Sequence, residues 1–273
     1  MNRYTWRTGV REGAMILVAL VFLFPIYILV NMAIRLPSDP TPAIIPTAKP
    51  TLDNFFAAWT EGNLGSAWLV TIALMISSVL VIVVVSALAS FTLARATAGW
   101  STWLYYVFMV GLLLPVQIAM VPLYKNMVAL GLAGSPVALF LLYVGLRLPF
   151  SIFLYVQFMR QLPVEYEEAA TIDGASAFGV FRRIVFPLMR PVTGVVVILN
   201  GLFIFNDFLS PLLYLTGTKY QTLTVSVFSF VGEYTSNWNL VFAALIIAAL
   251  PMLIVYFFLQ RTLIQGFASG IKG

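Results

Sequence analysis

The sequence predicts an all-α polytopic membrane protein with about six transmembrane helices, and three observations support this fold class. Of the 273 residues, 61% are hydrophobic and only 9% are charged, whereas about a quarter of a soluble protein is charged. Charge-free stretches recur at or near the roughly 20 apolar residues that cross a bilayer as a helix. Residues 79–86 are apolar on every face, unlike a membrane β-strand, in which apolar and polar residues alternate.

The six predicted spans are, in order, residues 13–34, 66–94, 103–123, 136–158, 188–214 and 239–260. The first could be confused with a secretory signal, but its apolar run exceeds the about 7–15 residues of a signal core. No small-residue cleavage site follows it at Arg35-Leu36-Pro37. We therefore expect this helix to be retained, and residues 1–273 to form a single transmembrane domain.

The basic residues are distributed asymmetrically about these spans. With a cytoplasmic N-terminus, ten of the 15 Lys and Arg residues lie on the cytoplasmic side, four lie outside, and Arg147 lies within a span. Cytoplasmic loops carry an excess of positive charge, so both termini are predicted to be cytoplasmic. The same bias explains the net charge of +5 without a nucleic-acid partner.

The loop after the first span, about residues 35–65, is then extracytoplasmic. It contains five prolines, which break helices and favour extended backbone. Residues 51–54 are predicted to cap a short helix that runs through Trp59. Phe55, Phe56 and Trp59 would then lie at the membrane interface, where aromatic residues concentrate. The alternative use of this helix is contact with a soluble partner.

Several chemistries are excluded by residues that the chain lacks. It contains no cysteine and no histidine, so disulfides, thiolate metal sites and the commonest general base are absent. No resident metal is expected. The phosphate-binding pattern Gly-x-x-x-x-Gly-Lys-Ser/Thr is also missing, so we expect no ATP site on this chain. Energy for any transport must come from another chain or from an ion gradient.

One loop away from the termini, residues 160–187, is polar and predicts two short helices. Pro163 suits the first turn of the first helix, and three glutamates follow it. Gly174 is placed to end that helix in a left-handed conformation, and Ser176 can cap the second helix. Pro187 would then begin the fifth span. A connection could be much shorter, so this charged helix pair predicts a docking surface for a soluble partner.

This loop resembles the EAA loop of binding-protein-dependent ABC importer permeases. The matching residues are Glu168-Ala169-Ala170, Asp173-Gly174-Ala175, Ile184 and Phe186-Pro187. The one departure is Phe186, where leucine is usual. Other features resemble the carbohydrate, maltose-type branch of that family, namely residues 260–273, Pro115, Pro122 and Asn206-Asp207-Phe208.

The resemblance implies that this loop is the coupling element, which sits in a cleft of an ATPase subunit. The residues it would use are Glu165, Glu168, Ala169, Ala170, Asp173, Gly174, Ala175, Phe178, Phe181, Ile184 and Pro187. It also implies a short permease subunit in a bacterial or archaeal cytoplasmic membrane. The partners would be a second homologous permease, two ATPase subunits that bind ATP and Mg²⁺, and an extracytoplasmic sugar-binding protein.

Polar groups within spans are energetically costly and are usually functional. Arg147 lies two residues before Pro149, where we expect a kink. It lines the pathway, or extends to the membrane interface by snorkelling, or satisfies the carbonyls freed by the kink. Asn206 and Asp207 suit the recognition of sugar hydroxyls but could equally join two helices. Gln117 is a weaker pathway candidate. Three aromatic residues could stack on sugars or simply pack in the core: Phe203, Phe205 and Phe208. In the maltose-type branch the sugar can contact mainly the partner permease.

Two other function classes are weighed against the importer. A self-contained, ion-coupled secondary transporter usually shows internal repeats and broken helices, but the sequence shows no clear repeat. A single intramembrane carboxylate, Asp207, also gives little basis for ion coupling. An intramembrane protease would need catalytic groups that are missing, since there is no histidine or cysteine and no paired aspartate in the spans.

Overall fold

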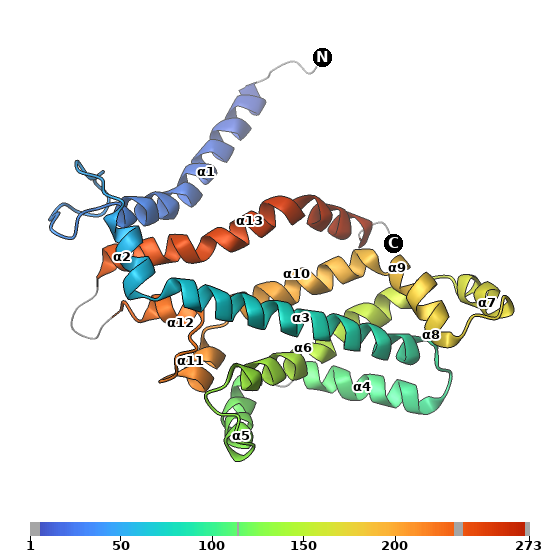
Figure 1. The fold of residues 1–273 in the computed structure, drawn as a ribbon. Helices are drawn as coiled ribbons and strands as arrows, with labels where there is room; N and C mark the ends of the chain where they lie inside the picture. Colours follow the sequence, from blue (N-terminus) through green and yellow to red (C-terminus); the bar gives the residue numbers. More distant parts are fainter. Residues whose placement is uncertain (1–5, 114, 232–236, 271–273) are drawn as a thin grey trace. The chain divides into compact units, whose positions relative to one another are not determined.

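The computed structural model describes residues 6–113, 115–231 and 237–270, and every regular element in these ranges is a helix (Figure 1). Within the described residues, three helices are long and apolar enough to cross a membrane unbroken: α1 (Trp6–Ala33), α3 (Leu64–Arg95) and α6 (Pro136–Met159). They coincide with the predicted first, second and fourth spans. The prediction of an all-α polytopic membrane fold is confirmed.

The predicted third span is broken rather than straight. It consists of α4 (Gly99–Leu113) and α5 (Val116–Ala129), which meet at 101°. Pro115 precedes α5 in an extended conformation, with φ −64° and ψ 116°. Proline lacks an N–H and disfavours helix at the residue before it, which explains the break. Hydropathy alone did not reveal it, because both halves are apolar.

The predicted fifth span, residues 188–214, is also interrupted. Its long helix is α10 (Arg190–Asn206), and after extended backbone at Asp207 a short α11 (Leu209–Leu215) follows. Pro187 does not begin this span, contrary to the prediction. It lies in α9 (Phe186–Leu188), and α10 begins with Pro191 in its first turn, where the missing N–H has no helical partner to lose.

The sixth predicted span corresponds to α13 (Trp238–Gly270), which α12 (Leu223–Phe228) precedes. The apolar part of α13 whose side chains are described runs from Trp238 to Ile254. Residues 271–273, at the end of the stretch that resembles the carbohydrate branch, lie outside the described residues.

The chain divides into two compact units, one formed by residues 1–65 and 223–251 and the other by residues 66–222 and 252–273. In the first unit, the predicted short helix is α2 (Asp53–Glu61). Its N-cap residue is Leu52, whose side chain makes no capping bond. The hydroxyl of Thr51 accepts the N–H of Asp53 instead. Phe56 and Trp59 are exposed, as an interfacial position would require.

The core of the second unit is formed by α3, α6, α10 and the segment before α10. Its most buried side chains are large and apolar, and they include Ile82, Leu139, Tyr155, Val185 and Val196. These helices are apolar around much of their circumference, so each can face lipid and a neighbouring helix at once. This core supports the two sites described next.

Candidate functional site

The polar loop between α6 and α10 folds as the predicted helix pair. Its helices are α7 (Glu165–Ile172) and α8 (Ala177–Val180). Gly174 has φ +83°, the left-handed conformation in which glycine has no Cβ penalty. The hydroxyl of Ser176 accepts the N–H of Gly179 at 3.2 Å. Both of these predictions are confirmed. Pro163 precedes the N-cap residue Val164, so its predicted place in the first turn is wrong.

An ion pair attaches α7 to the end of α3. The guanidinium of Arg95 donates to Oε1 of Glu167 through Nε at 2.9 Å and Nη2 at 2.7 Å. Nη2 also donates to the carbonyl of Leu162 at 3.2 Å. Neither Arg95 nor Glu167 was predicted to be a site residue. The available signal was an arginine ending a long apolar span and a glutamate in the loop helix, but nothing in the sequence pairs them.

Aromatic packing attaches the second half of the loop. Phe181 is only 7% exposed, and its ring lies 5.5 Å from Phe91, 6.4 Å from Phe178 and 5.8 Å from Phe186, measured between centroids. Phe181 therefore packs within this chain, while Phe178 is exposed. The segment Phe181–Val185 is a π-helical turn, a feature often found at functional sites.

The other predicted coupling residues divide by exposure. Those exposed to solvent are Glu165, Glu168, Ala169, Asp173 and Gly174, and those partly buried are Ala170, Ala175, Ile184 and Pro187. A shallow hollow of about 510 Å³ follows α7, lined by Val164, Glu167, Glu168, Thr171 and Ile172. Ile172 is 85% exposed. The loop thus presents an acidic and apolar surface on a base held by the Arg95–Glu167 pair and Phe181.

A line of polar side chains follows one face of α6. Tyr143, Arg147, Ser151 and Tyr155 are spaced four residues apart, a spacing that places them on the same side of a helix. We call them the α6 polar seam. Its partners come from the polypeptide between Thr193 and Asp207: Tyr155 donates to the hydroxyl of Thr193 at 3.1 Å, and Tyr143 interacts with Asp207.

Arg147 is held at the centre of this seam. Its Nε donates to Oδ1 of Asn200 at 2.7 Å, and the Asn200 amide donates to Ser151 at 3.0 Å. The guanidinium carbon lies 4.6 Å from the ring centroid of Phe150 and 4.4 Å from that of Phe203, so cation–π attraction adds to the hydrogen bond. Asn200 is fully buried and was not among the predicted pathway residues.

The remaining pathway candidates lie in different surroundings. Asp207 is partly buried in the break between α10 and α11, where it accepts the N–H of Ser210 at 3.4 Å. Asn206 is exposed, and its amide donates back to the carbonyl of Leu202. Gln117 is exposed on α5. Phe205 is buried. Among the described residues, no group of three or more acidic side chains could hold a metal ion.

Comparison with known proteins shows the family to which this chain belongs. Residues 87–269 match the model of the "binding-protein-dependent transport system inner membrane component" family. This match covers more than half of the chain. The chain belongs to this family of transport permeases. The matched region includes the whole helix-pair loop and the α6 polar seam.

Individual relatives of this permease are similar over most of their length. The melibiose/raffinose/stachyose import permease protein MelC of Bacillus subtilis is 33% identical over 94% of each chain. The probable starch degradation products transport system permease protein AmyC of Thermoanaerobacterium thermosulfurigenes is 33% identical over 80% of each. A chain of a bacterial ABC transporter involved in the import of the acidic polysaccharide alginate has a similar fold, with a TM-score of 0.82, 17% identity, and coverage of 96% of this permease and 99% of that chain.

Proposed function

We propose that this permease subunit moves a sugar or an oligosaccharide into the cytoplasm as part of an ABC importer. The observation that carries this proposal is the similarity to MelC, which extends over 94% of both chains. Its name describes the import of melibiose, raffinose and stachyose. The diacetylchitobiose uptake permease NgcG of Streptomyces coelicolor, 32% identical over 80% of this chain and 73% of its own, also supports a saccharide.

We propose the same set of partners that the sequence predicts. A second homologous permease would complete the membrane pathway, two ATPase subunits would bind ATP and Mg²⁺, and an extracytoplasmic sugar-binding protein would deliver the substrate. This chain would catalyse no reaction itself. Its termini would lie in the cytoplasm of a bacterium or archaeon. A cysteine at exposed Ser38 tests this orientation, since it should react with a membrane-impermeant thiol reagent from outside.

The coupling step would use the helix-pair loop. Its outer surface, from Glu165 to Phe178, would sit on the ATPase subunit, and closure of the ATPase dimer would displace α7. The loop is tied to α3 by the Arg95–Glu167 pair, and its second half continues through the π-helical turn and α9 into α10. Movement of the loop is therefore transmitted to a membrane helix rather than absorbed by a flexible linker.

The α6 polar seam is the proposed part of the pathway in this chain. Arg147 and Asp207 can hydrogen-bond sugar hydroxyls, and Phe203 beside Arg147 offers an aromatic surface. The alternative is that the seam only holds α6 to α10. Asn206 and Gln117, both exposed, would line the pathway only where it passes their own segments.

Uptake by the complete importer in vesicles tests the function. We expect radiolabelled oligosaccharide to accumulate only when ATP is present on the side of the membrane where the ATPase subunits lie. Accumulation should continue after ionophores collapse the ion gradients. Vanadate should stop it. Uptake that instead follows an ion gradient without ATP would support the secondary-transporter alternative, which family membership does not favour.

A further inference from the structure

Three side chains at the end of α1 form a ladder that binds a returning segment of the chain. Tyr27, Asn31 and Arg35 are spaced four residues apart, so they share one face of the helix and of the turn that follows it. Tyr27 Oη donates to the carbonyl of Ile44 at 2.9 Å. The Asn31 amide donates to the carbonyls of Ala43 and Ile45 at 2.6 and 2.9 Å.

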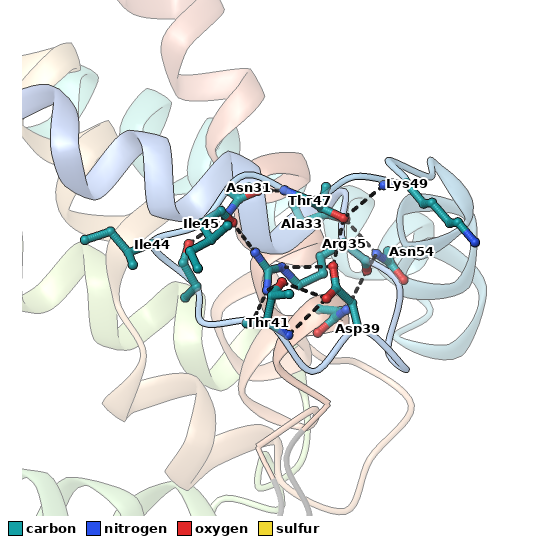
Figure 2. Close-up of polar contacts among 12 residues, drawn as sticks. Asn31, Ala33, Arg35, Asp39, Thr41, Ile44, Ile45, Thr47, Lys49 and Asn54 are labelled. Atoms are coloured by element: carbon teal, nitrogen blue, oxygen red, sulfur yellow. Dashed lines mark hydrogen bonds and ion pairs between the residues drawn. The ribbon is translucent and has the colours of Figure 1, made fainter.

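Arg35 is the last member of this ladder along the chain and lies at the centre of the cluster of polar contacts (Figure 2). It is only 2% exposed, and its guanidinium donates to the carbonyls of Thr41 and Ile45. The carboxylate of Asp39 lies 3.9 Å from Arg35 Nε and accepts hydrogen bonds from Thr41 and Thr47. Hydrogen bonds from Thr41 are the main cause that lowers the pKa of Asp39, so this carboxylate stays charged.

These contacts bind most carbonyls of residues 41–46, which we call the return segment. Every carbonyl from Thr41 to Ile45 accepts a hydrogen bond, since that of Pro42 takes the N–H of Ile45 at 2.9 Å. Pro42 and Pro46 have no N–H to satisfy. Lipid-exposed irregular backbone does not occur within the hydrocarbon core, so bonded carbonyls suit the return segment to the interfacial layer, where headgroups and water can still reach the N–H groups of Ala43 and Ile44.

The ladder also sets the depth of the return segment. Tyr27 lies six residues before the end of α1, or about 9 Å along the helix at about 1.5 Å per residue. Because Tyr27 binds the carbonyl of Ile44, Ile44 lies on the membrane side of the end of the first span rather than beyond it. Its side chain is 60% exposed and that of Ile45 is 47% exposed. No charged residue occurs from residue 40 to residue 48.

We propose that the return segment lies in the interfacial layer of the bilayer, with Ile44 and Ile45 in contact with lipid acyl chains. The inference rests on α1 spanning the membrane, and the proposed topology makes this the outer leaflet. A lipid surface fits better than a protein that binds and leaves. The bonded carbonyls offer a protein few polar contacts, and its departure would return two isoleucines to water.

Spin-label accessibility in the complete importer, reconstituted in lipid nanodiscs, tests this proposal. The chain contains no cysteine, so Ile44→Cys gives a single label on this subunit once the partner chains are freed of exposed cysteines. We expect it to collide with oxygen several-fold more than with a water-soluble nickel chelate. The matched controls are Ser38→Cys and Lys49→Cys in the same loop, both exposed, which should prefer the chelate. Figure 2 shows Lys49 on the opposite side of the cluster from Ile44.

Three results would overturn the proposal. A label at Ile44 that prefers the chelate as strongly as the Ser38 label would place the segment in water. A label shielded from both reagents would place it against the second permease. A label shielded only after the sugar-binding protein is added would make it a docking surface for that protein. None of these depends on sugar uptake, so failure here differs from failure of the proposed function.

A second substitution tests the ladder itself. Asn31→Ala removes the amide that donates to the carbonyls of Ala43 and Ile45 and accepts the N–H of Thr47. In the Ile44→Cys background, we expect it to lower the ratio of oxygen to chelate collisions several-fold, because the segment moves toward water. An unchanged ratio would show that the ladder does not hold the segment at this depth.

Discussion

The helix-pair loop and the return segment both lie between membrane helices, and an arginine holds each one, but their surfaces differ. Arg95 binds one glutamate of α7 and leaves most of the acidic and apolar loop surface open. Arg35 is buried and binds backbone carbonyls, so the return segment has few carbonyls left to offer. The first arrangement suits a protein partner and the second suits lipid.

The largest effect is expected from Gly174→Val in the helix-pair loop. Valine at φ +83° would cost at least about 1–2 kcal/mol of backbone strain and would re-aim α8 relative to α7. Sugar uptake and substrate-stimulated ATP hydrolysis should both fall at least about tenfold, the usual scale of coupling between sites. The amount of subunit in the membrane should stay near normal, because lipid and helix packing hold the spans.

Gly131→Val is the matched control for that substitution. Gly131 also has a positive φ, +70°, and a Cβ there would meet no atom within 4 Å, as at Gly174. The strain is similar, but Gly131 lies outside the helix-pair loop, so transport should be largely retained. Equal loss in both variants would mean that strain alone, and not coupling, explains the defect.

The α6 polar seam gives the next largest effect. Arg147→Leu removes a charged hydrogen bond to Asn200, a loss worth about 1.5–3 kcal/mol, and we expect uptake to fall about tenfold. Asp207→Asn should reduce uptake less, because the amide can still accept the N–H of Ser210. Complex yield should be measured beside uptake. A yield that falls in step with uptake would show that the residue only holds the helices together.

The Arg95–Glu167 pair should have an intermediate effect. Both side chains are mostly buried, at 19% and 15% exposure. Glu167→Gln should loosen α7 from α3 and lower uptake by about threefold to fivefold, as expected for roughly 1 kcal/mol. The charge exchange Arg95→Glu with Glu167→Arg should restore part of the loss. If the exchange is no better than Arg95→Glu alone, the pair does not position the loop.

The smallest effect is expected from Glu168→Ala. Glu168 is exposed, so the substitution would remove only its own contact with the ATPase subunit and leave the Gly174 turn intact. Uptake should fall by about twofold, within the range of an exposed charge contact. A loss as large as that of Gly174→Val would show that Glu168, and not the turn, dominates the coupling surface.

Much of the fold was predictable from the sequence because long apolar runs have few structural solutions in a membrane. The turn at Gly174 and the cap at Ser176 were predictable for a similar reason, since each depends on residues close in sequence. The breaks at Pro115 and Asp207 were not predicted, because hydropathy does not report backbone direction. Asn200, the Arg95–Glu167 pair and the ladder of Tyr27, Asn31 and Arg35 depend on contacts between distant segments, which residue spacing alone does not reveal.

Photo-crosslinking tests the central claim, that the helix-pair loop docks on an ATPase subunit, most directly. Asp173 is exposed at the C-terminal end of α7, so Asp173→Cys can carry a benzophenone label in the complete importer. Lys125→Cys on α5, predicted to face the opposite side of the membrane, is the control. We predict that the label at position 173 crosslinks to an ATPase subunit and that the label at position 125 does not. No crosslink from position 173, or equal crosslinking from both positions, would contradict the assignment of this loop as the coupling element.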